Sequence, residues 1–152
     1  MPKQYGQRCP VAKTLEVVGD RWTLLVVRDL LPGARRFQDL QLTLPGIAPN
    51  ILSTRLKLME DHGLIARRFY SDHPPRAEYA LTQKGRELAT VVGALAAWGG
   101  RYVYKRARLV HAECGHPVSV GYYCADCGKG VRGAGVTMKR GPARSGTSAR
   151  RG

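Results

Sequence analysis

Acidic side chains are scarce in this sequence. Its 11 Asp and Glu residues stand against 25 Lys and Arg, which gives a formal net charge of +14 at pH 7. An excess of this size holds a positive potential over much of a small protein's surface, so we expect a polyanionic partner. Nucleic acid is the usual partner of this kind, and an anionic membrane surface is the alternative.

Long apolar runs are also missing. A membrane-spanning helix needs about 20 predominantly apolar residues, and the longest runs here are far shorter. The basic start of the chain, residues 1–8, is not followed by the apolar stretch of a signal peptide. We therefore expect no membrane partner, a cytoplasmic location, and a reducing compartment in which the four cysteines form no disulfides by default.

Composition changes twice along the chain, which predicts four parts. After an N-terminal arm, 1–8, regular apolar periodicity runs through a domain at 9–105. An appendage rich in Cys, His and Gly follows at 106–131. The last segment, 132–152, is basic and has no apolar run, so we expect a disordered tail.

Four helices are predicted in the first half of the domain. Apolar periodicity and Pro or Gly punctuation place them at 11–18, 22–31, 37–44 and 49–62. The third is short and is followed directly by Pro45-Gly46.

The fourth predicted helix has two distinct faces. Its apolar residues recur at helical spacing and can face a core, namely Leu52, Leu56 and Met59. A second face carries Asn50, Ser53, Thr54 and Lys57, and we expect it to have no carboxylate. Amide, hydroxyl and ammonium groups can bond to base edges or phosphates, so a recognition helix in the major groove is one interpretation. An ordinary solvated helix face is the other.

A β-hairpin is predicted next, with strands at 64–70 and 77–81 around turn residues 71–76. This hairpin is a candidate wing, because arginine beside a recognition helix can enter the minor groove. Arg76 at its tip is the favoured contact, and His73 is expected to be a turn residue only. For Arg67 and Arg68, blunting of an edge strand is at least as strong an interpretation as DNA contact.

A single long helix is predicted over 82–102, with Thr82 as its N-cap. One apolar stripe contains Leu88, Val91, Val92, Leu95, Trp98 and Tyr102. So long a stripe favours a homodimer in which the same helix of a second copy covers it. Packing within one chain is the alternative.

Several short motifs in one order resemble the HxlR-type transcription regulators over about 9–104. They are Cys9-Pro10-Val11, Gly19-Asp20-Arg21-Trp22-Thr23, Arg36-Phe37, Leu44-Pro45-Gly46-Ile47, Leu52 to Leu58, Gly63-Leu64-Ile65, Pro74-Pro75-Arg76 and Tyr79-Ala80-Leu81-Thr82. The resemblance implies a mainly α winged helix-turn-helix fold, a bacterial or archaeal source, a homodimer, and a double-stranded DNA operator. We include Arg36 among the expected DNA contacts. Some members respond to electrophiles or oxidants through a cysteine like Cys9.

Cys9 has two interpretations. It precedes Pro10 at a predicted helix N-terminus and follows Arg8, and both the helix dipole and a neighbouring cation favour the reactive thiolate. A redox or electrophile sensor is therefore one interpretation. A small, buried and unreactive side chain is the commoner role of a free cysteine.

The appendage repeats one pattern, a ligand, two residues, a cysteine and a glycine. The two copies are His111 to Gly115 and Cys124 to Gly128. This spacing lets both ligands of a pair reach one ion, so we predict a structural, zinc-ribbon-like Zn²⁺ site of His111, Cys114, Cys124 and Cys127. His116 could replace His111. Free thiols, a disulfide or a thioredoxin-like pair are the alternatives.

Together these features predict a sequence-specific transcription regulator that acts as a homodimer and responds to a small-molecule or electrophile effector. The alternative is a nonspecific nucleic-acid-binding protein with a structural zinc site, for which charge alone would suffice. No Ser/His/Asp or paired-carboxylate arrangement stands out, so we do not expect an enzyme.

Overall fold

The computed structural model describes residues 4–72 and 75–139, and the chain divides into two compact units, 1–117 and 118–152. The division falls inside the segment 106–131 that the sequence predicts as one appendage. Met1 to Lys3, the predicted turn residue His73 with Pro74, and residues 140–152 of the predicted tail lie outside the described residues.

Helices α1 to α4 build the first half of unit 1 close to their predicted positions. They span Pro10–Val18, Thr23–Leu30, Phe37–Thr43 and Pro49–Asp61. Gly46 adopts a φ of +88° in the connection between α3 and α4, a conformation that glycine adopts without the Cβ penalty of other residues. Helices α3 and α4 and the tight connection between them therefore form a helix-turn-helix, in which α4 is the second helix.

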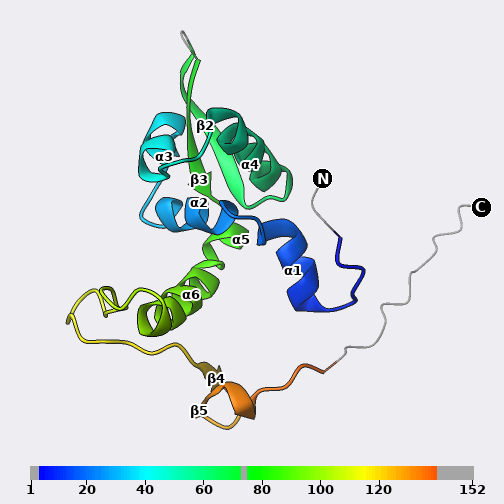
Figure 1. Ribbon diagram of the computed structural model, residues 1–152, viewed down its shortest axis with the longest axis vertical. Coiled ribbons are helices and arrows are strands. Elements are labelled where there is room, and N and C mark those ends of the chain that lie inside the picture. The colour runs from blue at the N-terminus through cyan, green and yellow to red at the C-terminus, as the bar shows by residue number, and fades with distance from the viewer. Residues whose placement is uncertain (1–3, 73–74, 140–152) are drawn as a thin grey trace, which may run out of the picture. The chain divides into compact units, whose positions relative to one another are not determined.

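A three-stranded antiparallel sheet accompanies the helices (Figure 1). Strands β2 (Ile65–Asp72) and β3 (Pro75–Leu81) form a hairpin that projects beyond α3 and α4. The sequence predicted a turn over 71–76, but both strands continue into this segment. The predicted turn was therefore too long. The short β1 (Arg35–Arg36) pairs with β3 on the other side and gives the order β1-β3-β2.

The core lies between these helices and the base of the sheet. Its fully buried side chains come from α2, α3, the α3–α4 connection and α4, and include Val26, Val27, Leu40, Leu44, Leu52, Leu56 and Met59. Leu64, Ile65 and Leu81, at the base of the hairpin, complete this hydrophobic core. This core positions α4 and the hairpin relative to each other.

The predicted single helix over 82–102 was wrong, because the chain forms two helices there. Thr82 is the N-cap as expected, and its hydroxyl oxygen accepts a hydrogen bond from the Gly85 amide at 3.1 Å. Helix α5 then ends after one turn (Gln83–Arg86), and α6 begins at Ala89 and ends at Tyr102. The break lies between Arg86 and Ala89. Just before it, on α5, Gly85 approaches the chain of Leu64 so closely that a Cβ would be 2.0 Å from its carbonyl oxygen.

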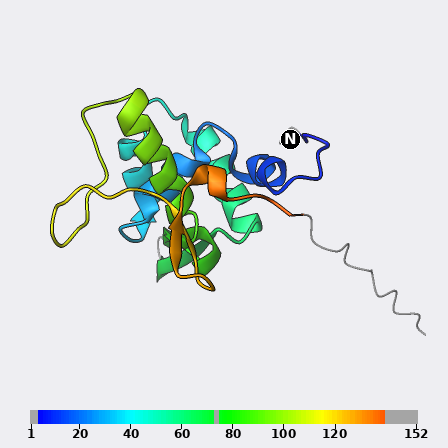
Figure 2. The same ribbon diagram turned by 90° about the horizontal axis from the view of Figure 1, so that it is seen from below.

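After α6, the described chain forms an extended loop without helix or strand up to β4 in unit 2, drawn in yellow in Figure 2. Unit 2 contains a small antiparallel pair, β4 (Tyr122–Cys124) and β5 (Lys129–Val131), and a 3₁₀ turn, Gly133–Gly135. That turn lies within the predicted tail of 132–152. No helix in the described parts of the chain is long and apolar enough to cross a membrane.

Candidate nucleic-acid interface

Helix α4 separates its two faces as the sequence predicted. Leu52, Leu56 and Met59 are buried in the core, which fixes the rotation of the helix about its own axis. The opposite face is exposed along its length and carries Asn50, Ser53, Thr54 and Lys57. The Thr54 hydroxyl donates to the Asn50 carbonyl at 2.8 Å, while Asn50 and Ser53 show no side-chain hydrogen bond among the described residues. This face can therefore offer amide and hydroxyl groups to a ligand.

The expectation that this face has no carboxylate was wrong. Lys57 forms an ion pair with Asp61, one turn further along α4. The hydrogen bond that Lys57 Nζ donates to the Asp61 carboxylate, and the negative charge of that carboxylate, raise the pKa of Lys57 above its ordinary value. Both side chains are exposed, and exposed ion pairs of this kind contribute little to stability, so Lys57 can exchange Asp61 for a phosphate.

An anchor that sequence reasoning missed holds the start of α2 against α4. The Asp20 carboxylate accepts hydrogen bonds from the amides of Trp22, at 2.8 Å, and Thr23, at 3.1 Å, and from the Thr23 hydroxyl. The same carboxylate lies 3.3 Å from Arg55 Nε on α4. An aspartate two or three residues before a helix is a known capping signal and could have been recognised, whereas its ionic partner could not.

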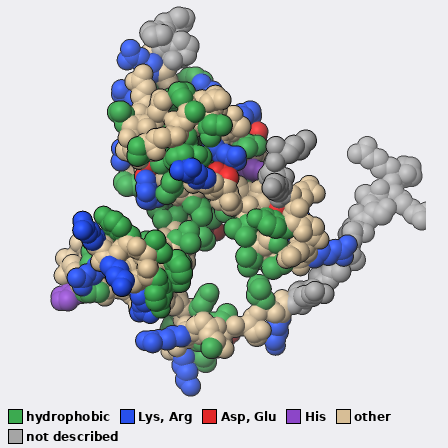
Figure 3. All heavy atoms as spheres, in the orientation of Figure 1, with side chains coloured by type: hydrophobic (Ala, Val, Ile, Leu, Met, Phe, Trp, Pro, Cys, Tyr) green, Lys and Arg blue, Asp and Glu red, His purple; other side chains and the backbone are tan. Residues whose placement is uncertain are grey.

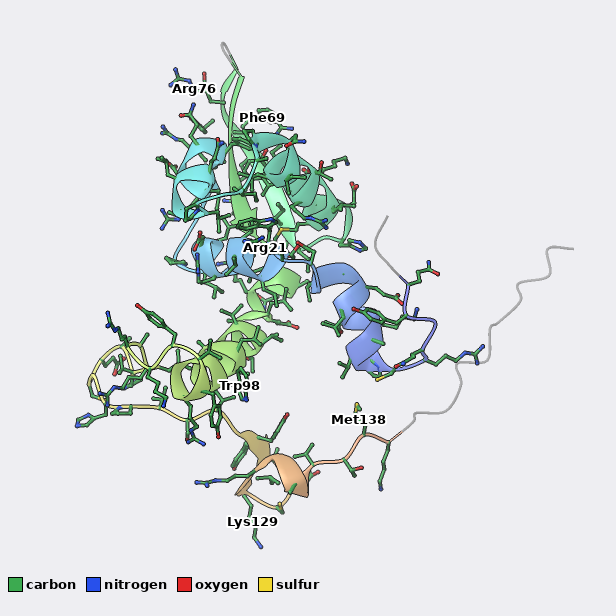
Figure 4. All side chains as sticks on the ribbon, in the orientation of Figure 1. Arg21, Phe69, Arg76, Trp98, Lys129 and Met138 are labelled. Carbon is green, nitrogen blue, oxygen red and sulfur yellow. The ribbon has the colours of Figure 1, made fainter. Side chains whose placement is uncertain are left out.

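The wing carries aromatic and cationic side chains close to α3. Arg36 precedes α3 and stacks over the Tyr70 ring of β2, with 4.9 Å between guanidinium carbon and ring centroid. Arg76 on β3 is exposed near the tip of the hairpin (Figure 4). A surface hollow of about 420 Å³ is lined by Arg36, Phe37, Gln38, Tyr70, Arg76 and Ala77. Two predicted contacts, Arg36 and Arg76, thus border one concave surface, and Tyr70 was missed.

The other two wing arginines lie on β2, which is an edge strand of the sheet. Arg67 and Arg68 are both exposed, and Arg67 stacks on Phe69 with 4.8 Å to the ring centroid. This position agrees with the blunting of an edge strand that the sequence suggested for the pair.

Helix α6 leaves an apolar face uncovered in the described chain. Leu88, just before the helix, and Val92 pack against the core, so part of the predicted stripe is covered within the chain. The remaining side chains are exposed by 39% (Val91), 53% (Leu95), 60% (Trp98) and 60% (Tyr102). Figure 3 shows hydrophobic side chains along this helix, and Figure 4 labels Trp98 among them.

Cys9 is half-buried at the N-cap of α1 and forms no disulfide, like the other three cysteines. Backbone hydrogen bonds from Ala12 and then Val11 lower the pKa of its thiol below the ordinary value. The lowered pKa means that the thiolate of Cys9 is stabilised relative to that of an ordinary cysteine.

The four predicted metal ligands fall into two pairs, one in each unit. His111 and Cys114 belong to unit 1, and Cys124 and Cys127 belong to unit 2. Within neither unit does the described chain gather three or more His, Cys, Asp or Glu side chains that could hold a metal. The backbone amide and the thiol of Cys127, and the Asp126 amide, lower the pKa of Cys124.

A helix-turn-helix with a basic hairpin beside an exposed polar helix defines the winged-helix class of DNA-binding proteins. Residues 17–107, more than half of the chain, match the HxlR-like helix-turn-helix family. The chain is similar to the HTH-type transcriptional regulator Rv3095 of Mycobacterium tuberculosis, with 38% identity over 136 residues that cover 87% of this chain and 85% of the relative. This alignment is longer than the family match and so extends outside it.

Two solved structures add to this comparison. The crystal structure of PA1607, a candidate transcription factor, is 34% identical, has a TM-score of 0.74 and covers 90% of this chain and 97% of its own. The redox regulator HypR in its reduced form is 32% identical, with a TM-score of 0.59 over 65% of this chain and all of its own. The chain therefore belongs to the HxlR-like family. It is a transcriptional regulator of the helix-turn-helix type and not an enzyme.

Proposed function

We propose that this protein binds a specific double-stranded operator as a homodimer, with α4 in the major groove and the β2–β3 wing against the neighbouring backbone or minor groove. The exposed face of α4 carries this proposal. Its opposite face is locked in the core, so Asn50, Ser53 and Thr54 stand in fixed directions on a convex helix surface. A major groove admits such a helix, and these groups match the hydrogen-bonding edges of bases.

The wing and α3 supply the charge that such a complex needs. Arg36 and Arg76 border the same hollow, and Lys57 ends the polar face of α4. Contacts to phosphates set register and affinity, while base contacts set specificity. Both kinds of group therefore lie on the helix-turn-helix and its wing.

A second copy of the chain fits the uncovered apolar face of α6. The uncovered residues Val91, Leu95, Trp98 and Tyr102 follow one another at spacings of four, three and four, which is the heptad spacing of a helix-to-helix seam. Only Arg101 brings charge into the last turn of the helix. A two-fold pair built on this seam would present two α4 helices to two half-sites about one DNA turn apart.

The test begins with selection of a binding sequence from randomised double-stranded DNA, followed by fluorescence anisotropy at one fixed salt concentration. Asn50→Ala should weaken binding to the selected site by about 1–3 kcal/mol, roughly 5- to 150-fold, and leave random DNA nearly unchanged. Gln83→Ala, which removes another exposed side-chain amide, on α5, is the matched control. Equal binding of Asn50→Ala and the parent protein to both DNAs would remove α4 as the recognition helix.

The dimer is tested separately by sedimentation. Leu95→Glu should convert dimer to monomer and reduce operator affinity, whereas Met138→Glu, at another exposed apolar position, should change neither. A folded Leu95→Glu variant that still sediments as a dimer contradicts the α6 interface.

A thiol response through Cys9 is the second candidate function. It rests on the lowered pKa of this half-buried thiol and on the likeness to a regulator described as a redox regulator. An oxidant or electrophile that modifies Cys9 would change operator affinity. We expect this response to persist when the other three cysteines are replaced by serine and to vanish in Cys9→Ser; the reverse pattern would exclude Cys9 as the sensor.

A further inference from the structure

The β2–β3 wing contains a β-bulge at Tyr70. Phe69 pairs with Ala77 and Ser71 pairs with Arg76, so the pairing between the two strands skips Tyr70. A bulge of this kind redirects a side chain from the regular alternation of the strand, and bulges are frequent beside functional sites. Tyr70 is therefore not held to the face of the sheet that strict alternation would give it.

The redirected Tyr70 ring contacts the guanidinium group of Arg36. The guanidinium carbon lies 4.9 Å from the ring centroid, within the range of a cation–π interaction. Arg36 is on β1 and Tyr70 is on β2, and β3 lies between these two strands in the sheet. The stack thus joins the two outer strands across the middle one. An exposed arginine has many rotamers, and stacking on a ring restricts them.

A second arginine borders the same surface. Arg36 and Arg76 both line the hollow of about 420 Å³, and its lining contains no carboxylate. Glu78 is the cross-strand neighbour of Arg36, but in the described part of the chain neither arginine forms an ion pair. Two guanidinium groups on one concave surface, without a neutralising carboxylate, favour the binding of an anion.

The openness of this surface indicates what kind of anion fits. Arg36, Tyr70 and Arg76 are all exposed, so an anion between them would remain open to solvent on one side. Small-molecule sites usually bury most of their ligand, whereas a phosphate within a polymer backbone must stay accessible on the side where the polymer continues. A guanidinium group matches the paired oxygens of a phosphate.

We propose that Arg36 and Arg76 together bind one phosphodiester group of the operator backbone, and that Tyr70 is the positioning residue of Arg36. This inference rests on the proposed binding of duplex DNA by the helix-turn-helix and the wing, and it assigns one contact within that complex. Because the ring holds the Arg36 guanidinium before DNA arrives, less side-chain freedom is lost when the phosphate binds.

The first experiment uses the selected operator in fluorescence anisotropy, with one phosphodiester at a time replaced by an uncharged methylphosphonate in each half-site. For the parent protein, neutralising the linkage that the two arginines bind should weaken binding roughly tenfold, because charge-assisted hydrogen bonds are lost. Arg36→Ala and Arg76→Ala should each bind the unmodified operator less tightly. Both variants should lose at most about twofold more when that same linkage is neutral, because the interaction is already absent.

The second experiment separates the ring of Tyr70 from its hydroxyl. Tyr70→Leu should weaken operator binding by about 2- to 5-fold, as expected for an exposed cation–π interaction, and should reduce the sensitivity to the same neutral linkage. Tyr70→Phe keeps the ring and should behave like the parent protein. Arg67 stacks on Phe69 in the same way, at 4.8 Å, but neither residue lines the hollow, so Phe69→Leu is the matched control and should keep the full sensitivity.

The stack is also measured without DNA, through the Nε–Hε resonance of Arg36 in nuclear magnetic resonance spectra. A proton held over the face of an aromatic ring is shifted upfield, and Tyr70→Phe should keep this shift while Tyr70→Leu removes it. Unchanged amide resonances of the core residues Leu52 and Leu56 show that a variant is folded. If Tyr70→Leu does not fold, the scan with the two arginine variants still tests the phosphate contact, and Tyr70→Phe still tests the ring.

The outcomes separate this inference from the proposed function. Specific duplex binding in which no single linkage accounts for the losses of both Arg36→Ala and Arg76→Ala overturns the inference and leaves the proposed function standing. A Tyr70→Phe variant that loses the Arg36 shift or binds as weakly as Tyr70→Leu overturns the positioning role of the ring. Stoichiometric binding of inorganic phosphate without DNA, lost in Arg36→Ala, would assign the hollow to a free anion instead. A parent protein that binds no duplex removes the proposed function and this inference together.

Discussion

Replacement of Asp20 tests how the recognition helix is held in place. Its carboxylate caps the start of α2 through the amides of Trp22 and Thr23 and forms an ion pair with Arg55 on α4. Asp20→Ala removes both interactions, whereas Asp20→Asn keeps an oxygen that can accept from the amides and loses the charge. The pair of variants therefore separates capping from ion pairing.

The expected magnitudes follow from these contacts. Loss of a helix N-cap costs about 0.5–2 kcal/mol. The side chains of Asp20 and Arg55 are exposed by only 19% and 29%, so their pairing should contribute at the upper end of the range for surface ion pairs, about 1 kcal/mol. We expect Asp20→Ala to lower the free energy of unfolding by about 1.5–3 kcal/mol, and Asp20→Asn by about 1 kcal/mol. Operator affinity of Asp20→Ala should fall as well, because α4 loses one of its fixed neighbours.

The assay is urea unfolding followed by far-UV circular dichroism and by fluorescence of the two tryptophans, Trp22 and Trp98. Arg55→Met, alone and combined with Asp20→Asn, completes a double-mutant cycle that isolates the ion pair. Lys13→Ala, which breaks the i,i+3 ion pair between the exposed Lys13 and Glu16 on α1, is the control and should change stability by less than about 0.5 kcal/mol. Equal losses in Asp20→Ala and Asp20→Asn, or additive effects of Asp20→Asn and Arg55→Met, would refute the division between cap and ion pair.

Three further predictions concern the wing, Gly85 and Cys9. Arg76→Ala should reduce the slope of log affinity against log salt by about 1 if this side chain neutralises one phosphate, and Arg86→Ala on α5 should not; equal slopes in all three proteins would remove the wing contact. Gly85→Ala should destabilise unit 1 by several kcal/mol in urea unfolding, because its Cβ would overlap the Leu64 carbonyl oxygen, and an unchanged midpoint would contradict that close approach. Alkylation of Cys9 by iodoacetamide should reach half its maximal rate at a lower pH than in the urea-unfolded protein, because the folded pKa is lowered; a midpoint at or above the unfolded one would exclude the thiolate-stabilising cap.

Local sequence determined the parts of the fold that depend on helical period and capping. The spacing of Leu52, Leu56 and Met59 predicted the buried face of α4, because neighbours at i+4 and i+7 share one side of any helix. Thr82 was recognised as an N-cap because its hydroxyl acts on an amide only three residues away. The same locality predicted the two turns that end at Gly115 and Gly128, both of which have positive φ, because the repeated spacing of His, Cys and Gly is visible without tertiary structure.

Other features of the fold depend on tertiary contacts, which local sequence patterns do not reveal. Strand β1 is two residues long and exists only because Arg35 and Arg36 lie beside β3. The close approach of Gly85 on α5 to Leu64 likewise joins residues that are distant in the sequence. The partnership of Asp20 with Arg55 joins residues 35 positions apart, a distance over which charge pattern in the sequence carries no information about proximity. Helical period places Leu88 and Val92 in one apolar stripe with Trp98, but only the packed core shows that the first two are covered and the third is exposed.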